Sequence, residues 1–167
     1  RAVYAPWLNP VHPLILETVL PEQIKRLQSR FPLTEPAQLK RSQDAWDRLA
    51  RGIAQLSAAG VKIGVGTDGG GQQGDQFIGW TMHAELENMV MAGIPPAKVL
   101  VAATRTSAEI LGLDDLGMVA VGKSADFVVL DANPLDDITN TRKISSVYLR
   151  GHRIDREKLR AGFVKRQ

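Results

Sequence analysis

The stretch Val61-Lys-Ile-Gly-Val-Gly-Thr-Asp68-Gly-Gly-Gly71 decides the fold of this chain. Residues 61–67 predict a strand that is entered directly from a helix, and Asp68 follows where that strand ends. The three glycines then open a polar loop that extends to about Gly79. A helical pattern precedes the strand and two more follow the loop. Helix, strand, loop and helix in this order predict an α/β fold with a parallel sheet.

The flanking helices are marked by proline and glycine. Pro21 is a good first helical residue, and that helix should end before Pro32. A longer helix begins near Pro36 and ends at Gly60, a residue type that commonly follows a helix end. Its apolar residues recur at helical spacing and predict one apolar stripe, formed by Leu39, Trp46, Leu49, Ile53 and Leu56. Two further helices are predicted over about 82–92 and 96–111.

The pattern changes after Gly112. Residues 118–121, 126–130 and 144–149 are short runs typical of strands, separated by turn residues. They predict a small antiparallel β unit. We therefore divide the chain into residues 1–117 and 118–167, with the boundary near 113–118.

Composition excludes several classes of protein. The 167 residues carry 21 basic and 18 acidic side chains, a net charge of +3, and contain no cysteine. A disulfide scaffold, a thiolate zinc site and a cysteine nucleophile are therefore excluded, and a reducing, cytoplasmic compartment is the expected setting. No apolar run is long enough to span a membrane. The basic residues are interleaved with acids and aromatics make up 5%, so we expect no nucleic-acid partner. Because the chain opens with Arg1, a targeting signal in a parent protein cannot be judged.

Asp68 is the first candidate for chemistry. A carboxylate released from the end of a strand into a glycine-rich loop lies where α/β barrels place catalytic groups. It can bind a metal and accept a proton from metal-bound water. Aspartate is equally common in turns that it stabilises with its own side chain. The residues alone leave both interpretations open.

Two other functions remain alternatives. Gly64, Gly66 and Gly69 have the spacing of a dinucleotide-binding loop, so a nucleotide-binding module using Gly64–Gly71 is one alternative. In that motif the glycines open a helix, whereas here Gly70 and Gly71 continue a loop. A non-catalytic interaction domain of the same fold is the other alternative.

His83 and Glu85 form a His-x-Glu pair near the start of a predicted helix. Residues two apart do not share a helix face, so the pair is not a helical metal site. For His83 the alternative is a partly buried histidine with a satisfied hydrogen bond. His12 and His152 are isolated, and a metal site needs several convergent groups.

An ordered series of motifs resembles the C-terminal portion of the amidohydrolase superfamily, in particular the metal-dependent hydrolases of the imidazolonepropionase and Xaa-Pro dipeptidase-like group. The resemblance covers about residues 60–155. Its motifs, in chain order, are Val65-Gly-Thr-Asp68-Gly, His83-Ala-Glu85-Leu86, Ala92-Gly93-Ile-Pro95-Pro96, Ala102-Ala-Thr104, Ala108-Glu-Ile-Leu111-Gly112, Leu116-Gly-Met-Val-Ala-Val-Gly122-Lys123-Ser-Ala125-Asp126 and Asn133-Pro134-Leu135.

The resemblance implies a metal-dependent hydrolase of C–N bonds in amides, cyclic amides, ureas or dipeptides. It makes Asp68 a metal ligand and the general base, and it places His83, Gly69 and Gly70 at the mouth of the substrate pocket. The implied cofactor is one or two divalent ions, zinc first and iron or manganese as alternatives. Most of the ligands would lie outside this chain, because the histidine motifs of the early barrel strands are missing.

The resemblance also implies the fold: the C-terminal part of a (β/α)8 barrel with part of a small β-sandwich. A complete barrel takes about 250 residues, so this chain cannot close one. We therefore expect an N-terminal remainder of the barrel as partner, on the same or a separate polypeptide, and an inactive chain in its absence. A homo-oligomer is a further possibility.

Overall fold

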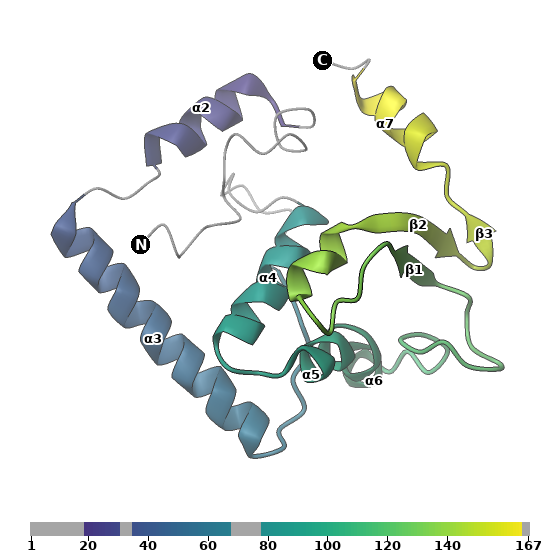
Figure 1. Ribbon diagram of the computed structural model, residues 1–167, viewed down its shortest axis with the longest axis horizontal. Coiled ribbons are helices and arrows are strands. Elements are labelled where there is room, and N and C mark those ends of the chain that lie inside the picture. The colour runs from purple at the N-terminus through teal and green to yellow at the C-terminus, as the bar shows by residue number, and fades with distance from the viewer. Residues whose placement is uncertain (1–18, 31–34, 68–77, 165–167) are drawn as a thin grey trace.

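The computed structural model describes residues 19–30, 35–67 and 78–164, in which a group of helices is followed by a small antiparallel sheet (Figure 1). The first part contains α2 (Pro21–Arg30), α3 (Pro36–Ala58), α4 (Trp80–Met91), α5 (Pro96–Val101), the π-helix η2 (Ala102–Thr106) and α6 (Ser107–Leu111). The second part contains β1 (Phe127–Leu130), the 3-10 helix η3 (Ile138–Arg142), β2 (Ile144–Leu149), β3 (His152–Arg153) and α7 (Arg156–Val164). The α/β class is confirmed in that the described residues combine helices with a sheet, but this sheet is antiparallel, and the predicted parallel sheet is not found among the described residues. None of the described helices is long and apolar enough to cross a membrane.

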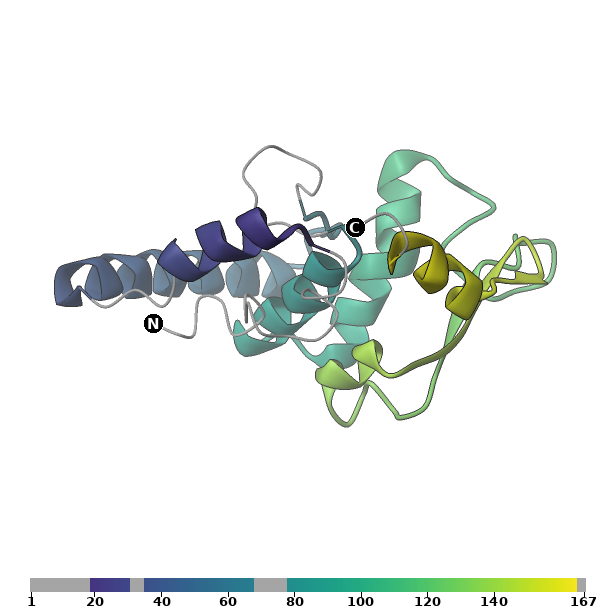
Figure 2. The ribbon, with the colours of Figure 1, turned by 90° about the horizontal axis from the view of Figure 1, so that it is seen from above.

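The helix α3 runs along one side of the molecule, and the sheet lies on the opposite side (Figures 1 and 2). The predicted helix over 36–60 is confirmed, with Pro36 in its first turn and Gly60 just beyond its end at a φ of +76°. Its apolar stripe is only partly covered, because no residue of α3 is buried and Leu49 is 71% exposed. Ile53 is the stripe residue that packs against the main core.

The main core lies between α4, α5 and η2. Because Gly93, at a φ of +97°, and Pro95 end α4 and start α5, the chain turns back and the apolar sides of the two helices face each other. Ile138 of η3 reaches the same cluster from the C-terminal part of the chain. The buried members are Leu86, Met89, Ile94, Val99, Ala102 and Ile138.

The segment 61–67 is extended but forms no strand with any other described residue, so the predicted strand is wrong as an assigned element. From Lys62 onward its exposure nevertheless alternates: Ile63 and Val65 pack against the main core, whereas Lys62, Gly64 and Gly66 are exposed. This alternation has the period of a strand with one face covered. A strand also needs a neighbour with which to exchange backbone hydrogen bonds. The segment therefore has the side-chain pattern of a strand without its ladder.

The predicted helix over 96–111 is continuous but changes its hydrogen-bond pattern in the middle. A π-helical turn, η2, lies between α5 and α6. The Ser107 hydroxyl donates to the carbonyl of Ala102 at 2.7 Å, five residues back, and so pairs a carbonyl within the widened turn. The same oxygen accepts a hydrogen bond from the backbone N–H of Val65 at 3.0 Å. Ser107 thus joins the π-helical turn to the extended segment.

The sheet has the order β1-β2-β3 with antiparallel pairing throughout, which confirms the predicted strands near 126–130 and 144–149. Phe127 and Tyr148 are direct partners, and their rings stack at 4.5 Å. β2 and β3 are joined by Arg150 and Gly151, both at positive φ, as a two-residue hairpin requires. The Arg150 N–H donates to Asp126 Oδ1 at 2.5 Å, which ties this turn to the start of β1. Asp126 therefore has a structural contact.

The predicted strand over 118–121 is wrong: these residues are not assigned to any strand of the described sheet. Val119 is 83% exposed and Val121 fully exposed. Short β-prone runs become strands only where a neighbour supplies the other half of the ladder. This run has the composition of a strand and lacks such a neighbour in the described part of the chain.

Gly117 and Gly122 offer a matched test of packing. Both have φ near +80°, but a Cβ on Gly117 would lie 2.8 Å from Ala108 Cβ and 2.9 Å from Arg105 Cα, whereas one on Gly122 would meet nothing within 4 Å. We expect Gly122→Ala to cost about 1 kcal/mol of unfolding free energy from backbone strain. Gly117→Ala should cost about 3 kcal/mol because overpacking is added. Urea denaturation measures both, and equal losses would show that the close approach is not tight.

Candidate functional site

The catalytic candidate Asp68 and the neighbouring Gly69 and Gly70 lie outside the described residues. The segment that leads into Asp68 is described, and it is held against the helices. Gly64 lies so close to α6 that a Cβ there would be 3.3 Å from Ser107 Oγ. Together with the Val65–Ser107 hydrogen bond, this contact fixes the segment three residues before Asp68. The close approach gives Gly64 a packing role against α6.

The described part of the candidate site is the first turns of α4, which begins at Trp80. Trp80 is buried at 7% exposure and packs against Val19 and Ile24. The Arg142 guanidinium lies over its indole ring at 4.6 Å, a favourable cation–π geometry. η3 thus contacts the first turn of α4 through Arg142 and Trp80.

His83, a predicted substrate-binding residue, faces the same 3-10 helix. Its Nδ1 lies 3.0 Å from the Thr141 hydroxyl, and its ring meets Trp80 edge-on at 6.3 Å. The ring is partly buried. This is the satisfied, partly buried histidine that the sequence left as the alternative interpretation, and the contact leaves Nε2 as the nitrogen on which a substrate role would depend. Glu85 lies two residues further on, on a different face of α4, where its carboxylate accepts a hydrogen bond from the Asn88 side chain at 3.5 Å.

Arg142, which follows Thr141 in η3, also forms an ion pair with Glu87 of α4. Glu87 Oε1 is 2.5 Å from Arg142 Nη2, and the two side chains are 12% and 26% exposed. The Arg142 Nε is buried, and no described group accepts a hydrogen bond from it. Burial raises the pKa of the Glu87 carboxyl above its ordinary value of 4.5, although Arg142 opposes the rise. Removing one partner of such a pair leaves an uncompensated charge, which costs more than the pair contributes.

The protonation of His83 is shifted by the same surroundings. Burial lowers the pKa of its imidazole below the ordinary 6.5, and the positive charge of Arg142 lowers it further. The folded protein therefore favours the neutral ring more strongly than the unfolded chain does. Consequently, the part of the stability that depends on a neutral His83 is lost as the pH falls from about 6.5 through the folded-state pKa.

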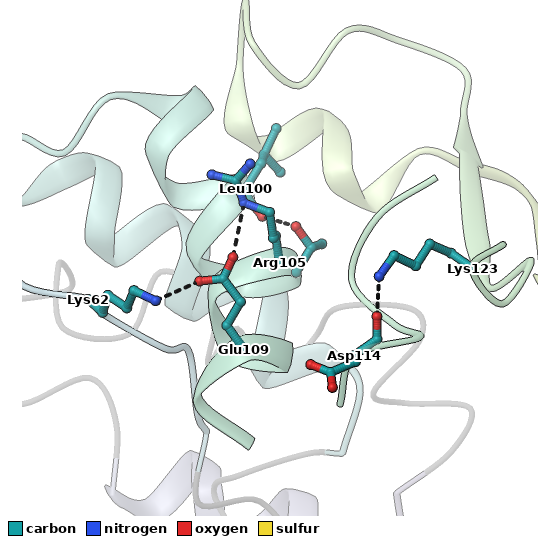
Figure 3. Close-up of polar contacts among 7 residues, drawn as sticks. Lys62, Leu100, Arg105, Glu109, Asp114 and Lys123 are labelled. Atoms are coloured by element: carbon teal, nitrogen blue, oxygen red, sulfur yellow. Dashed lines mark hydrogen bonds and ion pairs between the residues drawn. The ribbon is translucent and has the colours of Figure 1, made fainter. Parts of the chain in front are cut away.

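A second cluster of charges lines an open groove of about 500 Å³ between residues 60–63 and the helices α5 to α6. Figure 3 shows Glu109 between Lys62, at 2.9 Å, and Arg105, at 3.5 Å. The Lys62 hydrogen bond lowers the pKa of the Glu109 carboxyl. All three side chains are largely exposed, so these pairs contribute little to stability. Nearby, the Lys123 ammonium donates to the Asp114 carbonyl. The charged residues of the groove thus form solvated ion pairs.

Metal ligands do not converge in the part of the chain that the structure describes. No three His, Cys, Asp or Glu side chains among residues 19–30, 35–67 and 78–164 come close enough together to hold an ion. Zinc needs three or four protein ligands. The described residues alone therefore do not form a metal centre, and Asp68 is the one ligand that the sequence predicts on this chain.

Thr141 and Arg142 are the residues that the sequence analysis missed. They lie 58 and 59 residues after His83 along the chain, and no local spacing connects them. The only local signal is the Asp137 carboxylate, which accepts from the Thr139 N–H at 2.9 Å and caps η3.

Comparison with known proteins places the chain in a family. The amidohydrolase family model matches residues 12–154, and the chain therefore belongs to the amidohydrolase family. The chain is 40% identical over 95 residues to a 5-methylthioadenosine/S-adenosylhomocysteine deaminase from Desulforudis audaxviator strain MP104C, a match that covers 52% of this chain and 22% of the deaminase.

Solved structures agree with this placement. A putative prolidase from Bifidobacterium longum superposes with a TM-score of 0.62 at 33% identity, over 90% of this chain and 36% of the prolidase. A bottromycin amidohydrolase gives a TM-score of 0.70 over 95% of this chain and 36% of its own, and at 24% identity it supports the fold alone. The chain thus spans less than two fifths of each of these relatives.

The charge of Arg142 can be tested through His83. Replacing Arg142 by Met should raise the pKa of the His83 imidazole toward 6.5, because a repelling positive charge is removed. Arg142→Lys keeps the charge and should hold the pKa of His83 low, although it loses the planar stacking on Trp80. NMR titration of the imidazole proton signals measures both variants. A His83 pKa that responds equally to Lys and Met would show that charge is not the cause.

Proposed function

We propose that the chain provides the C-terminal part of a hydrolase that cleaves C–N bonds in amides, cyclic amides, ureas or dipeptides. The family match over residues 12–154 carries this proposal. The names of the relatives support the reaction class, because they include deaminases, an Xaa-Pro dipeptidase and a phenylurea hydrolase. Each of these names denotes the hydrolysis of a carbon–nitrogen bond.

Within this proposal Asp68 is the general base. It accepts the proton of the attacking water and passes it to the leaving nitrogen, which must be protonated to depart. Val65 and Gly64, which lead into it, are held by Ser107, and this contact supports a fixed direction for the chain as it reaches Asp68. Gly69, Gly70 and His83 are proposed to contact the substrate at the mouth of the pocket.

A divalent metal is part of the proposal because the resemblance to metal-dependent hydrolases implies one. Zinc is favoured, with iron or manganese as alternatives, in one or two sites. Such an ion, when bound, lowers the pKa of water to about 7 and so provides hydroxide at neutral pH. The Asp68 carboxylate is a suitable ligand, but one carboxylate does not hold an ion. The other ligands are proposed to come from a complementary polypeptide.

Unpaired surfaces support such a partner. The extended segment 61–67 presents a strand pattern with no ladder among the described residues, and Val119, Val121 and Leu49 are between 71% and fully exposed. Exposed apolar side chains and an unpaired strand-like segment are features that a contact with another polypeptide would cover. We propose that the remainder of the barrel and of the sandwich covers them, either as a separate chain or as a preceding part of the same one. Association of this chain with itself is the competing outcome.

The role of Asp68 predicts the effect of Asp68→Asn. In the assembled hydrolase this substitution should lower kcat by at least about 100-fold, because general-base catalysis contributes about 10²–10⁴-fold. Asp131→Asn, which changes an exposed carboxylate in the same way, should leave kcat unchanged. Turnover of an amide substrate and bound metal per chain are the measurements. Retained turnover in Asp68→Asn would remove this residue from the mechanism.

The partner proposal predicts the composition of the purified protein. Native mass spectrometry should show the 18.2 kDa chain bound to a larger polypeptide, together with one or two metal ions. The isolated 167-residue chain should hold no metal and show no amide hydrolysis. Activity of the isolated chain would refute the partner proposal, and an oligomer made only of this chain, with a mass that is a multiple of 18.2 kDa, would favour self-association.

A further inference from the structure

The hydrogen bonds of the Thr141 hydroxyl determine which ring nitrogen of His83 carries the hydrogen. Thr141 is buried at 6% exposure. Its hydroxyl oxygen lies 2.9 Å from the Ile138 carbonyl oxygen and 3.0 Å from His83 Nδ1. Both neighbours are within hydrogen-bond distance of a group that has a single proton to donate.

The carbonyl decides where that proton lies. A carbonyl oxygen only accepts, so its short contact with Thr141 is favourable only if the hydroxyl donates to Ile138. The hydroxyl oxygen must then accept from His83, and Nδ1 must carry the hydrogen. The opposite arrangement would place two buried oxygens 2.9 Å apart without a proton between them. Only the first arrangement satisfies all three groups.

We propose that Thr141 is a positioning residue whose hydroxyl holds His83 as the Nδ1–H tautomer, so that Nε2 accepts a hydrogen bond from an N–H group of an amide-type substrate. The identity of that substrate class rests on the proposed function, whereas the tautomer rests on the hydrogen bonds alone. A neutral imidazole has one donor and one acceptor nitrogen. With Nδ1 fixed as donor, Nε2 recognises N–H groups and rejects carbonyl oxygens.

The surroundings of His83 favour the neutral form that this role requires. The Arg142 charge and burial both disfavour a second proton on the ring. The Trp80 ring meets the His83 ring edge-on, with the centroids 6.3 Å apart. Thr141 and Arg142 are consecutive residues of η3, so one turn of helix sets both the tautomer and the charge of His83.

The tautomer can be observed directly in the 167-residue chain. In a two-dimensional ¹H–¹⁵N spectrum of the histidine rings at pH 7.5, Nδ1 of His83 should appear protonated and Nε2 unprotonated. His12→Gln and His152→Gln variants assign the signals of the three histidines. Thr141→Ser keeps the hydroxyl and should preserve the pattern, whereas Thr141→Val removes it and should move the ring toward the Nε2–H tautomer. Thr139→Val, an exposed threonine of the same 3-10 helix, is the matched control.

An Nε2–H ring in the wild-type chain would overturn the proposal, as would an unchanged tautomer in Thr141→Val. The wild-type spectrum decides the tautomer even if Thr141→Val does not fold. Because the spectrum requires neither metal nor turnover, its result is independent of the proposed function.

The substrate contact is tested in the assembled hydrolase with acetanilide and N-methylacetanilide, which differ in the N–H. Wild type and Thr141→Ser should have a lower KM for acetanilide than for N-methylacetanilide. In Thr141→Val the ratio of the two KM values should fall about tenfold, with little change in kcat. An unchanged preference in Thr141→Val would overturn the contact. Failure of the wild-type assembly to hydrolyse any amide would defeat the proposed function. The tautomer of His83 would still be decided by the NMR spectrum.

Discussion

The packing of η3 against α4 is the contact on which the arrangement of this chain depends. Ile138 enters the helical core at 6% exposure, and four residues later Arg142 lies over Trp80 and pairs with Glu87. Without this one short helix, the sheet would connect to the helical part mainly through the segment around Gly117. The partly buried ion pair between Arg142 and Glu87 requires a defined geometry, because a guanidinium that shifts leaves the carboxylate unpaired and poorly solvated. The contact between η3 and α4 is therefore specific as well as apolar.

The helices could be predicted from the sequence because their causes are local. Pro21 and Pro36 begin α2 and α3, and Gly60 and Gly93 end α3 and α4 at positive φ. The strands β1 and β2 were predictable for a similar reason, since the turns that flank them are marked by Gly122, Asn133-Pro134 and Gly151. The amidohydrolase family could be identified from the order of such short motifs, and the family match confirms it.

Long-range partners limited the prediction elsewhere. Residues 61–67 and 118–121 have the composition of strands, but a strand exists only where a neighbour completes its ladder, and composition does not contain that information. The π-helical turn at 102–106 was missed because it depends on Ser107, whose hydroxyl serves both its own helix and Val65. The contact between His83 and Thr141 joins residues that are 58 positions apart in the sequence. The sequence therefore indicated that His83 could have a hydrogen-bond partner but did not indicate which residue it is.

The position of Asp68 links chemistry to assembly. The segment before it is anchored on one face, by Ile63 and Val65 in the core and by one hydrogen bond to Ser107. A strand inside a barrel is also held by two neighbours through a ladder on each side, and such positioning to within an ångström is what proton transfer requires. One anchored face fixes the direction of a chain less strictly than three constraints do. If neighbouring strands complete the ladder, they set the position of the carboxylate as well as supplying its companion ligands, and the catalytic geometry and the assembly of the protein then form together.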